Sequence, residues 1–477
     1  MVLGAATALV AGAAGLIGWR LMSGPIGLDV MTPWLISSLE QRLGEGHRVS
    51  VGGTQLERDE EGRASLRLRD VVVRSADGVV VASAPKAEVG LSGAGLFTGR
   101  LQAERISLIG ATMSVRVEAD GEITLFTGAE TRPVVRAPAV MPPKQTGAAA
   151  SSAPAERGFA QGLASFLSWI EGLDALGLDG GGLTELGLKS GALIVDDRRG
   201  DKRWAFENIN LSLTRPREGG VAFAVNSSGS DGPWSLTATV SPLGEGRRAL
   251  EAVMRDLSPK DLLLAMRIDP GAFSADMPIS AMLRADIGAD GTVSRAEARV
   301  VAGAGNFGDP NEPANRVLID EAHLSLRWDQ ASRTLIAPIE VSSGNSRVSL
   351  IVGAEGPAEA NAPWMIAVSR GIISIAPAER TREPPLLIDR IDFRARFDPF
   401  KKRIDIDRGD FTGMAAGIAM SGSIDYSGQD PLIALGVAGT RMSALTFKRI
   451  WPIFVASDVR AWVAGSLFGG AIDRIVI

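Results

Sequence analysis

The sequence predicts a mainly β fold: an elongated, curled antiparallel β-sheet that forms an apolar groove from repeated units, with a few short helices and an N-terminal transmembrane helix. Three observations predict it. Apolar residues recur at every second position through most of the chain, as they do in half-buried strands. The chain has 56 glycines and only 5% aromatic residues, which suits short strands joined by tight turns.

The third observation is repetition. Alternating strands run into a tryptophan-bearing helical segment at residues 388–477, and similar parts occur in the same order at 221–287. Repeated β units with apolar alternation are typical of elongated sheets.

Composition limits the classes of function. A chain of 477 residues with 45% hydrophobic residues can bury a core and holds several domains. The net charge of -5 is spread evenly, without the basic stripe of a nucleic-acid-binding protein. There is no cysteine, and the two histidines, His47 and His323, lie far apart in the sequence. We therefore expect no catalytic, cofactor or metal site, and an enzyme ranks third among the functions considered.

The first residues favour a membrane anchor. Residues 2–19 carry no charge and span about 27 Å as a helix, which just crosses the hydrocarbon core of a bilayer. A cleaved signal sequence and a core helix of a soluble domain are the alternatives. We assign residues 1–22 to the anchor.

Residues 23–130 are expected to form a helix followed by a β-meander. Apolar residues at i, i+4 spacing predict a helix at 31–43, and strands follow, with turns at Asp77-Gly78 and Asp120-Gly121. Residues 131–158 are rich in Pro, Ala and Ser and read as a linker.

Two β-groove repeats are expected after the linker, at 159–300 and 301–477. The first opens with a helix near 159–170 that either docks on the sheet or caps its end, and it contains a helix begun by Ser258 and Pro259. Residues 470–477 open a strand that no partner follows in the sequence, so we expect a fragment of a longer protein.

Charged and glycine-rich clusters have simple structural explanations. Asp196, Asp197, Arg198, Arg199 and Asp201 fit a solvated hairpin tip, and Asp405, Asp407 and Asp410 fit the wet face of a strand. Glycines at 90–95 and 180–182 lack the context of a phosphate-binding loop and are expected to be turns.

The one-sided apolar strands are the feature that suggests a function. They either pack face to face in a closed sandwich or line a groove that is dry enough for acyl chains. The candidate groove residues are Leu66, Leu68, Val89, Leu91, Val115, Val117, Leu211, Leu213, Phe223, Leu283, Leu324, Leu326, Ile366, Phe393, Phe397 and Met420.

Two segments resemble a known family. One carries Trp451, Pro452, Arg460, Trp462 and Gly469 in RIWPIFVASDVRAWVAGSLFGG. The other is a PK…V…L…G.L…RI.L.GA pattern, made by Pro85, Lys86, Val89, Leu96, Gly99, Leu101, Arg105, Ile106, Leu108, Gly110 and Ala111. With the N-terminal apolar run, they resemble the AsmA-like family of bacterial envelope proteins, nearest its long YhdP-type and TamB-related members.

The resemblance implies an inner-membrane-anchored protein whose bulk lies in the periplasm and whose β-groove conducts phospholipid between the inner and outer membranes. It implies phospholipid, the inner membrane and outer-membrane or periplasmic proteins as partners, and no catalytic residue or cofactor. The alternative function is a structural or assembly factor for outer-membrane proteins, with a closed β core.

Overall fold

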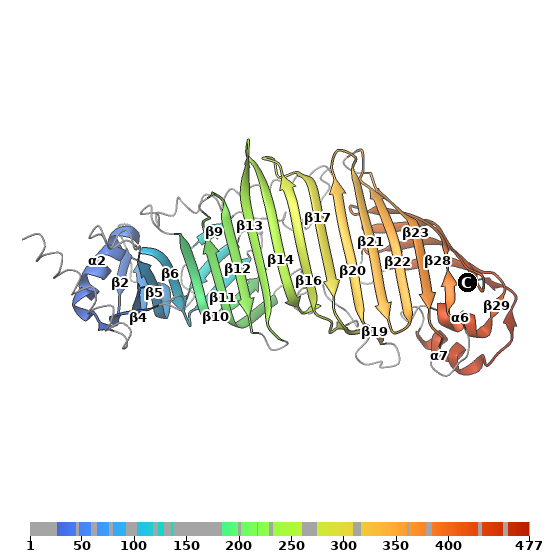
Figure 1. The fold of residues 1–477 in the computed structure, drawn as a ribbon, viewed down its shortest axis with the longest axis horizontal. Helices are drawn as coiled ribbons and strands as arrows, with labels where there is room; N and C mark the ends of the chain where they lie inside the picture. The colour runs from blue at the N-terminus through green and yellow to red at the C-terminus, as the bar shows by residue number, and fades with distance from the viewer. Residues whose placement is uncertain are drawn as a thin grey trace, which may run out of the picture. The chain divides into compact units, whose positions relative to one another are not determined.

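The computed structural model describes residues 26–43, 47–58, 64–75, 80–91, 103–117, 123–127, 135–137, 184–198, 202–216, 218–228, 232–259, 274–308, 316–359, 362–377, 384–427, 432–451 and 457–476. Strands dominate these residues, and the helices are few and short (Figure 1). The predicted mainly β class is thus confirmed. The chain forms two compact units that divide between Gly244 and Glu245, which lies inside the range 159–300 expected to form one repeat.

Unit 1 contains most of the predicted strands of the first half of the chain. Its elements are β1 (Ile26–Gly27), η1 (Asp29–Met31), α2 (Thr32–Leu43), β2 (His47–Ser50), β3 (Gly53–Arg58), β4 (Ala64–Ser75), β5 (Val80–Leu91), β6 (Ala103–Ile109), β7 (Thr112–Val117), β8 (Ile123–Thr127), β9 (Val135–Ala137), β10 (Glu185–Asp197), β11 (Lys202–Thr214), β12 (Val221–Ser227) and β13 (Trp234–Gly244).

The sheet of unit 1 is mostly antiparallel but not a simple meander. β4 pairs with β2 and β3 on one side and with β5 on the other, and β5 pairs with β6. β10 then lies parallel to both β6 and β7, before β11, β12 and β13 follow in antiparallel order. The expectation of a purely antiparallel sheet is therefore wrong here. A long connection between β9 and β10 lets the chain return in the same direction, which parallel pairing requires.

The predicted helix at 31–43 is confirmed as α2, and it covers part of the apolar side of this sheet. Leu35 packs against Leu66, Leu68, Val71 and Val89 in one buried cluster. The helix is also tied to the strands by polar contacts: the Val49 backbone N–H donates to the Glu40 carboxylate at 2.9 Å. Burial of Leu35 against the sheet is what makes this short amphipathic helix stable, since an isolated helix of this length is marginal in water.

Unit 2 carries the longest regular sheet. Its elements are β14 (Arg247–Leu257), β15 (Ser274–Ala275), β16 (Ile279–Ile287), β17 (Val293–Ala302), β18 (Gly305–Gly308), β19 (Val317–Ile319), β20 (Glu321–Asp329), β21 (Thr334–Ser343), β22 (Ser346–Glu355), β23 (Trp364–Ile375), β24 (Leu386–Ile388), β25 (Arg390–Asp398), β26 (Arg403–Thr412), β27 (Gly417–Asp425), β28 (Leu432–Gly439), β29 (Met442–Ser443), α6 (Ala444–Ile450), α7 (Ser457–Ser466), β30 (Ala471–Ile472) and β31 (Ile475–Val476).

Strands β14, β16, β17, β20, β21, β22, β23, β25, β26, β27 and β28 pair in this order, and every pair is antiparallel. Two small sheets stand beside this one, β15-β18-β19 and β29-β30. In Figure 1 the later strands, up to β28, bend around behind β22 and β23, so the sheet of unit 2 is curled.

The end of unit 2 folds back onto its own sheet. α6 begins at its N-cap Ser443, whose hydroxyl accepts from the Thr446 N–H at 3.0 Å. Phe447 and Ile450 of α6 pack with Leu386, Met442 and Ile475. Residues 470–477, expected to open a strand, contain two short strands that pair with earlier ones: β30 pairs with β29, and β31 pairs with β28.

The structure tests three further expectations from the sequence. Gly90 is not in a turn but inside β5, where a Cβ atom would come within 2.7 Å of the Arg105 guanidinium. Residues 135–137, within the expected linker, form β9 and pair with β8. The hairpin predicted around residues 196–201 is confirmed by the antiparallel pairing of β10 with β11.

The expected anchor at 1–22, the turns at 77–78 and 120–121, the helix near 159–170, the glycines at 180–182 and most of the helix after Ser258 lie outside the described residues. Within the residues that are described, no helix combines the length and the apolar character needed to span a bilayer.

The buried leucines of unit 1 provide a test of this packing. Leu188 of β10 is 0% exposed and contacts Ala84 and Ala111, whereas the Val30 side chain is 96% exposed. We expect Leu188→Ala to lower the free energy of unfolding by about 2–5 kcal/mol, because it removes buried methyl groups and leaves a cavity.

Val30→Ala is the matched control and should change the free energy of unfolding by less than about 0.5 kcal/mol. Urea unfolding followed by circular dichroism measures both variants. Equal effects of the two substitutions would contradict the assigned packing of β10.

Candidate functional site

One face of the sheet in unit 2 is apolar from β14 to β28, apart from Arg248 at the start of β14. Directly paired residues share a face, and the register pairs apolar residues with apolar residues from strand to strand. One such row runs from Leu283 to Ala298, Leu326 and onward, and another joins Val352, Val368 and Phe393. We call this surface the apolar face. It includes Leu250, Ala252, Leu283, Ala285, Ala298, Val300, Leu324, Leu326, Leu335, Ile339, Leu350, Val352, Ile366, Val368, Phe393, Phe397, Ile404, Ile406, Met420, Ile424, Leu435 and Val437.

β-bulges keep the apolar face continuous where the alternation of the sequence changes phase. In β23 the apolar positions are 364, 366 and 368, then 371 and 373, and the register shifts between these two sets. In β26 they are 404 and 406, then 409 and 411, with a second register shift. The extra residue is polar in each case, Ser369 and Asp407. A bulge adds one residue to a strand, so it returns the apolar residues to the same side.

The opposite face of unit 2 carries the charges. Ion pairs join neighbouring strands across it: Arg284 with Glu251, Arg327 with Glu297, and Arg396 with Asp407. Asp405, Asp407 and Asp410 belong to this face, as the sequence predicted. Each of them is paired with an arginine, at 2.6–2.8 Å. These exposed pairs contribute little stability each, but they make this side of the sheet strongly charged, with Met282, Ile336 and Met365 exposed among them.

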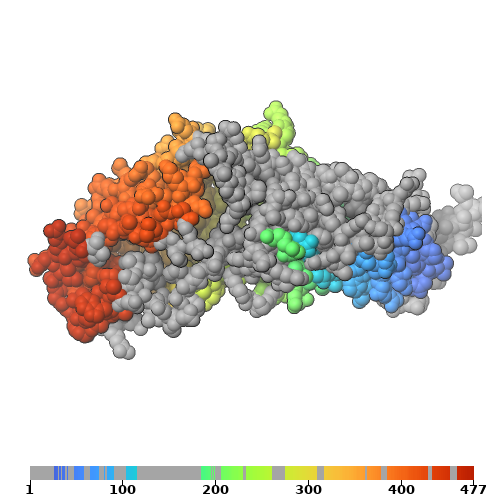
Figure 2. All heavy atoms as spheres, turned by 180° about the vertical axis from the view of Figure 1, so that it is seen from behind, coloured from blue at the N-terminus to red at the C-terminus, as the bar shows by residue number. Residues whose placement is uncertain are grey.

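Most large side chains of the apolar face are half-buried, and the buried ones, Ile287, Leu386 and Ile388, lie at strand ends. Leu324, Leu350, Val368, Phe393 and Met420 are all half-buried, and along the middle strands only small residues such as Ala337 and Ala395 are fully covered. A closed sandwich would bury such residues completely, as unit 1 does with Leu66, Leu68 and Leu188. Figure 2 shows a hollow bordered by the orange strands of unit 2, with its yellow strands visible inside.

The structure brings the candidate residues of each unit to one face. In unit 1 the register aligns Leu66 with Val89, and Leu211 and Leu213 with residues of β10 and β12, among them Phe223. In unit 2 it places the remaining candidates on the apolar face: Leu283, Leu324, Leu326, Ile366, Phe393, Phe397 and Met420. Leu91, Val115 and Val117 lie in strands β5 and β7, but their side chains are outside the described part of the chain.

The structure describes four of the five motif residues of the C-terminal segment. Trp451 ends α6 and its ring meets that of Phe447 edge-on at 5.2 Å. Arg460 and Trp462 are on α7, where the Trp462 side chain is 65% exposed, and Gly469 follows that helix with no heavy atom within 4 Å of an added Cβ. Pro452 is outside the described residues.

Sequence reasoning missed an aromatic row at one edge of the apolar face. Trp328 and Trp364 lie 5.5 Å apart between ring centroids, and Phe397 and Tyr426 stack at 6.5 Å. Trp364 and Phe397 are direct partners in the register, so the four residues form a row across β20, β23, β25 and the end of β27. We call this row the aromatic rim. The sequence did not predict the aromatic rim, because its four residues are far apart in the chain and only the strand pairing brings them together.

The tryptophan pair of the aromatic rim is held by specific contacts. The Trp328 Nε1–H donates to the Val293 carbonyl at 3.0 Å, which satisfies the indole. Gly356 lies beneath both rings, since an added Cβ would be 3.2 Å from Trp328 and 3.4 Å from Trp364. Glycine at this position lets the two rings meet across the intervening strands.

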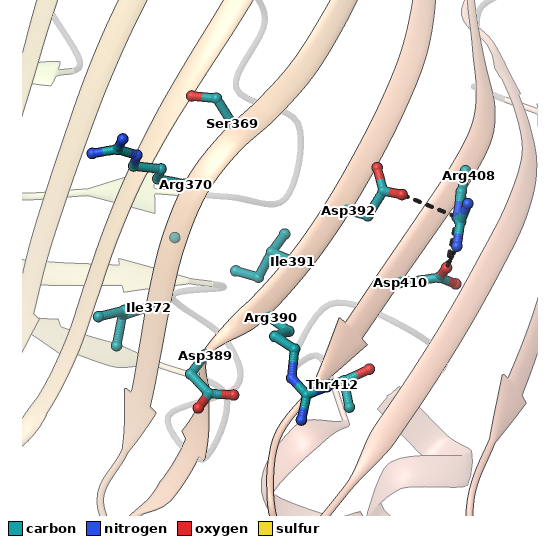
Figure 3. Close-up of a pocket in the computed structure, with 11 residues that line it drawn as sticks. Ser369, Arg370, Ile372, Asp389, Arg390, Ile391, Asp392, Arg408, Asp410 and Thr412 are labelled. Atoms are coloured by element: carbon teal, nitrogen blue, oxygen red, sulfur yellow. Dashed lines mark hydrogen bonds and ion pairs between the residues drawn. The ribbon is translucent and has the colours of Figure 1, made fainter.

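A shallow depression of about 580 Å³ lies on the polar side of unit 2, over β23, β25 and β26 (Figure 3). Arg408 bridges Asp392 at 3.3 Å and Asp410 at 2.6 Å within it, and Arg394 also pairs with Asp392 at 3.5 Å, so both carboxylates have cationic partners. In Figure 3 Arg370 and Arg390 point in different directions and do not converge on a common ligand position. The arrangement is that of a salt-bridged strand surface.

The charged tip of the β10–β11 hairpin is likewise paired. Asp196 accepts from Arg116 at 3.2 Å and from Arg198 at 3.1 Å. Burial alone would raise the pKa of Asp196, but the hydrogen bonds from both arginines outweigh it and lower the pKa below its usual value. Among the described residues, no three His, Cys, Asp or Glu side chains gather as a metal site would require.

Comparisons with protein-family models, with curated proteins and with solved structures find no match to this chain. The functional interpretation therefore depends on the geometry of the apolar face and on the residues that line it.

The turn between β25 and β26, beside the aromatic rim, gives a test by pH. Asp398 accepts from the backbone N–H groups of Lys401 and Phe400, at 2.9 and 3.1 Å, and pairs with the Lys401 ammonium at 3.2 Å. Mainly because of the Lys401 N–H, the pKa of Asp398 lies below its usual value. A lowered pKa means that the carboxylate stabilises the fold above about pH 4, the unfolded value, and that this stabilisation is lost as pH falls through the folded pKa.

We expect Asp398→Asn to lower the free energy of unfolding by about 1 kcal/mol at pH 7, because neutral hydrogen bonds replace charge-assisted ones, and to flatten the loss of stability below pH 4. Urea unfolding at several pH values measures this. Asp473→Asn is the control, since its pair with Arg441 is exposed on both sides. An unchanged pH profile in Asp398→Asn would contradict the assigned role.

Proposed function

We propose that this protein binds phospholipid acyl chains on the apolar face and conducts phospholipid along it between two membranes. The observation that carries the proposal is the half-buried state of the large apolar side chains on that face of unit 2. Half-exposed leucine, isoleucine, valine and phenylalanine side chains in such number cost free energy in water, and acyl chains would remove this cost.

The polarity of the sheet supports the same proposal. Charged residues in ion pairs are spread over the opposite face, so the apolar face is the side of the curled sheet that favours hydrocarbon. A surface that is apolar and long in one direction suits a chain that moves along it rather than one held in a single pocket. The groove of the predicted fold class is, in this proposal, the concave side of the curled sheet of unit 2.

The location belongs to the proposal as well. We place the protein at the bacterial inner membrane, anchored by residues 1–22, with the bulk of the chain in the periplasm, in line with the resemblance to AsmA-like envelope proteins. Outer-membrane or periplasmic proteins would then receive or deliver the lipid. The absence of cysteine fits an oxidising compartment.

The first experiment compares two neighbouring positions on β20. Leu326 is on the apolar face and Ser325 is on the polar face, where its register partner is Arg299. Leu326→Glu puts a carboxylate against the acyl chains, which costs several kcal/mol if it stays ionised, so we expect phospholipid transfer between vesicles to fall about tenfold or more. Ser325→Glu should transfer at the wild-type rate. Circular dichroism of both variants checks that the fold is kept.

Lipid extraction and mass spectrometry of the wild-type protein, purified without added lipid, complete the test. Bound phospholipid in the wild type, and much less in Leu326→Glu, is the expected result. A wild-type protein that carries no phospholipid, or equal transfer by both variants, would sink the proposal and would favour the alternative of an assembly factor with a closed β core.

A further inference from the structure

The aromatic rim occupies one defined level of unit 2. β20 ends at Asp329 and β21 begins at Thr334, β22 ends at Glu355 and β23 begins at Trp364, and β25 ends at Asp398. Trp328, Trp364 and Phe397 lie within two residues of these ends, and Tyr426 directly follows β27. The register puts Trp328 and Phe397 in the same rows as residues of the apolar face, Leu335 and Ile404. The rim therefore forms the border between the apolar face and the turns.

The aromatic side chains of the rim are suited to the boundary between an apolar phase and water. Tryptophan and tyrosine have a large apolar body and a polar group, and they concentrate where an apolar phase meets a polar one. Tyr426 is the only tyrosine in the chain, and it lies here. Burial, and then the Asp398 carboxylate, raise the pKa of Tyr426, so its hydroxyl stays protonated and remains a hydrogen-bond donor at neutral pH.

Cations lie directly beyond the rings. The Tyr426 N–H donates to the Lys402 carbonyl at 2.9 Å, which fixes the β25–β26 turn next to the stacked Phe397 and Tyr426 rings. Lys402 is exposed, has a positive φ of 51° and forms no ion pair among the described residues. Lys401 is 78% exposed and is held by Asp398. Ammonium groups beyond an aromatic border can form ion pairs with a lipid phosphate.

The opposite strand ends offer a different surface. From β23 to β27 the apolar face at that end is covered, since Ile375, Leu386 and Ile418 pack with Phe447 and Ile450 of α6. The two ends of these strands thus differ: at one end α6 covers the apolar face, and at the other the apolar face borders aromatic rings and charged turns.

We propose that the aromatic rim sets the orientation of bound phospholipid, with the headgroup phosphate at the turn 398–403 beyond the rim and the acyl chains on the apolar face inside it. This inference rests on the proposed function, because it needs a lipid on the apolar face. It goes beyond it by assigning the headgroup to one edge of the sheet and by naming Lys402 and Tyr426 as its contacts.

Two photoreactive probes test the orientation in the full-length chain. Both are phosphatidylethanolamines, one with a diazirine on the headgroup amine and one with a diazirine at the end of an acyl chain. After irradiation, the labelled peptides are identified by mass spectrometry. The headgroup probe should label the turn 398–403 and the turn 329–333 at the same strand ends, and the acyl probe should label strand interiors, including Leu350 and Met420.

The two proposals fail in different ways. Acyl labelling on the apolar face, with headgroup labelling near α6 or spread evenly over the strands, would overturn the orientation and leave the proposed function standing. Labelling of neither region by either probe would overturn both.

Substitutions in the turn and in the aromatic rim test the assigned headgroup position directly. Lys402→Glu changes an exposed side chain and leaves the packing intact, and it should lower headgroup labelling of the turn by about threefold or more without changing acyl labelling, as expected for the loss of one exposed charge contact. Trp328→Ala with Trp364→Ala should shift headgroup labels inward, and Trp462→Ala, which removes an exposed tryptophan from α7, is the matched control. Unchanged headgroup labelling in Lys402→Glu would contradict the assignment of the phosphate to this turn.

Discussion

The register of the antiparallel ladder is the constraint on which the rest of unit 2 depends. Side chains alternate strictly between the two faces of a sheet, so a slip of one residue in any pair would move a whole set of apolar side chains to the charged face. The ladder from β14 to β28 avoids this by placing a bulge at each change of phase. At the second of these, Asp407 is the extra residue, and its carboxylate binds Arg396 through hydrogen bonds of 2.7–3.1 Å. The ion pair thus fixes the bulge on the polar side while Ile406 and Gly409 stay on the apolar one.

Exposure of the apolar face to water costs free energy, and the helices cover only parts of this face. α2 covers a portion of the sheet in unit 1 through Leu35, and α6 covers one end of the rows in unit 2 through Phe447 and Ile450. Between these places the large side chains of unit 2 remain half-exposed. Glycines deepen the surface there: a Cβ at Gly371 or Gly409 would come within 2.6–2.7 Å of Leu350 or Met420, so these side chains lie across bare backbone. Bound acyl chains, as proposed above, would remove this cost because they would cover the half-buried apolar side chains.

The charges complete the division of the molecule into an apolar and a polar side. Arginine and carboxylate side chains alternate across neighbouring strands, and most of them are exposed. Their individual contribution to stability is small, but together they keep this side of the sheet hydrated and discourage association of one sheet with another. The aromatic rim lies where these two surfaces meet at the strand ends, and it is the only place where rings from distant strands form a row among the described residues.

Local structure could be predicted from the sequence: the period of two predicts the strands, the i, i+4 apolar spacing predicts α2, and alternation shows which residues share a side in strands without a bulge. These features depend on neighbouring residues and on backbone geometry, which every segment carries within itself. Three features became visible only in the folded chain. β10 runs parallel to β6 and β7, bulges in β23 and β26 keep their apolar residues on one face, and Trp328, Trp364, Phe397 and Tyr426 form one rim. The physical reason is that these features arise from pairing between residues far apart in the chain, and the choice of partner follows from the free energy of the whole sheet rather than from any one segment.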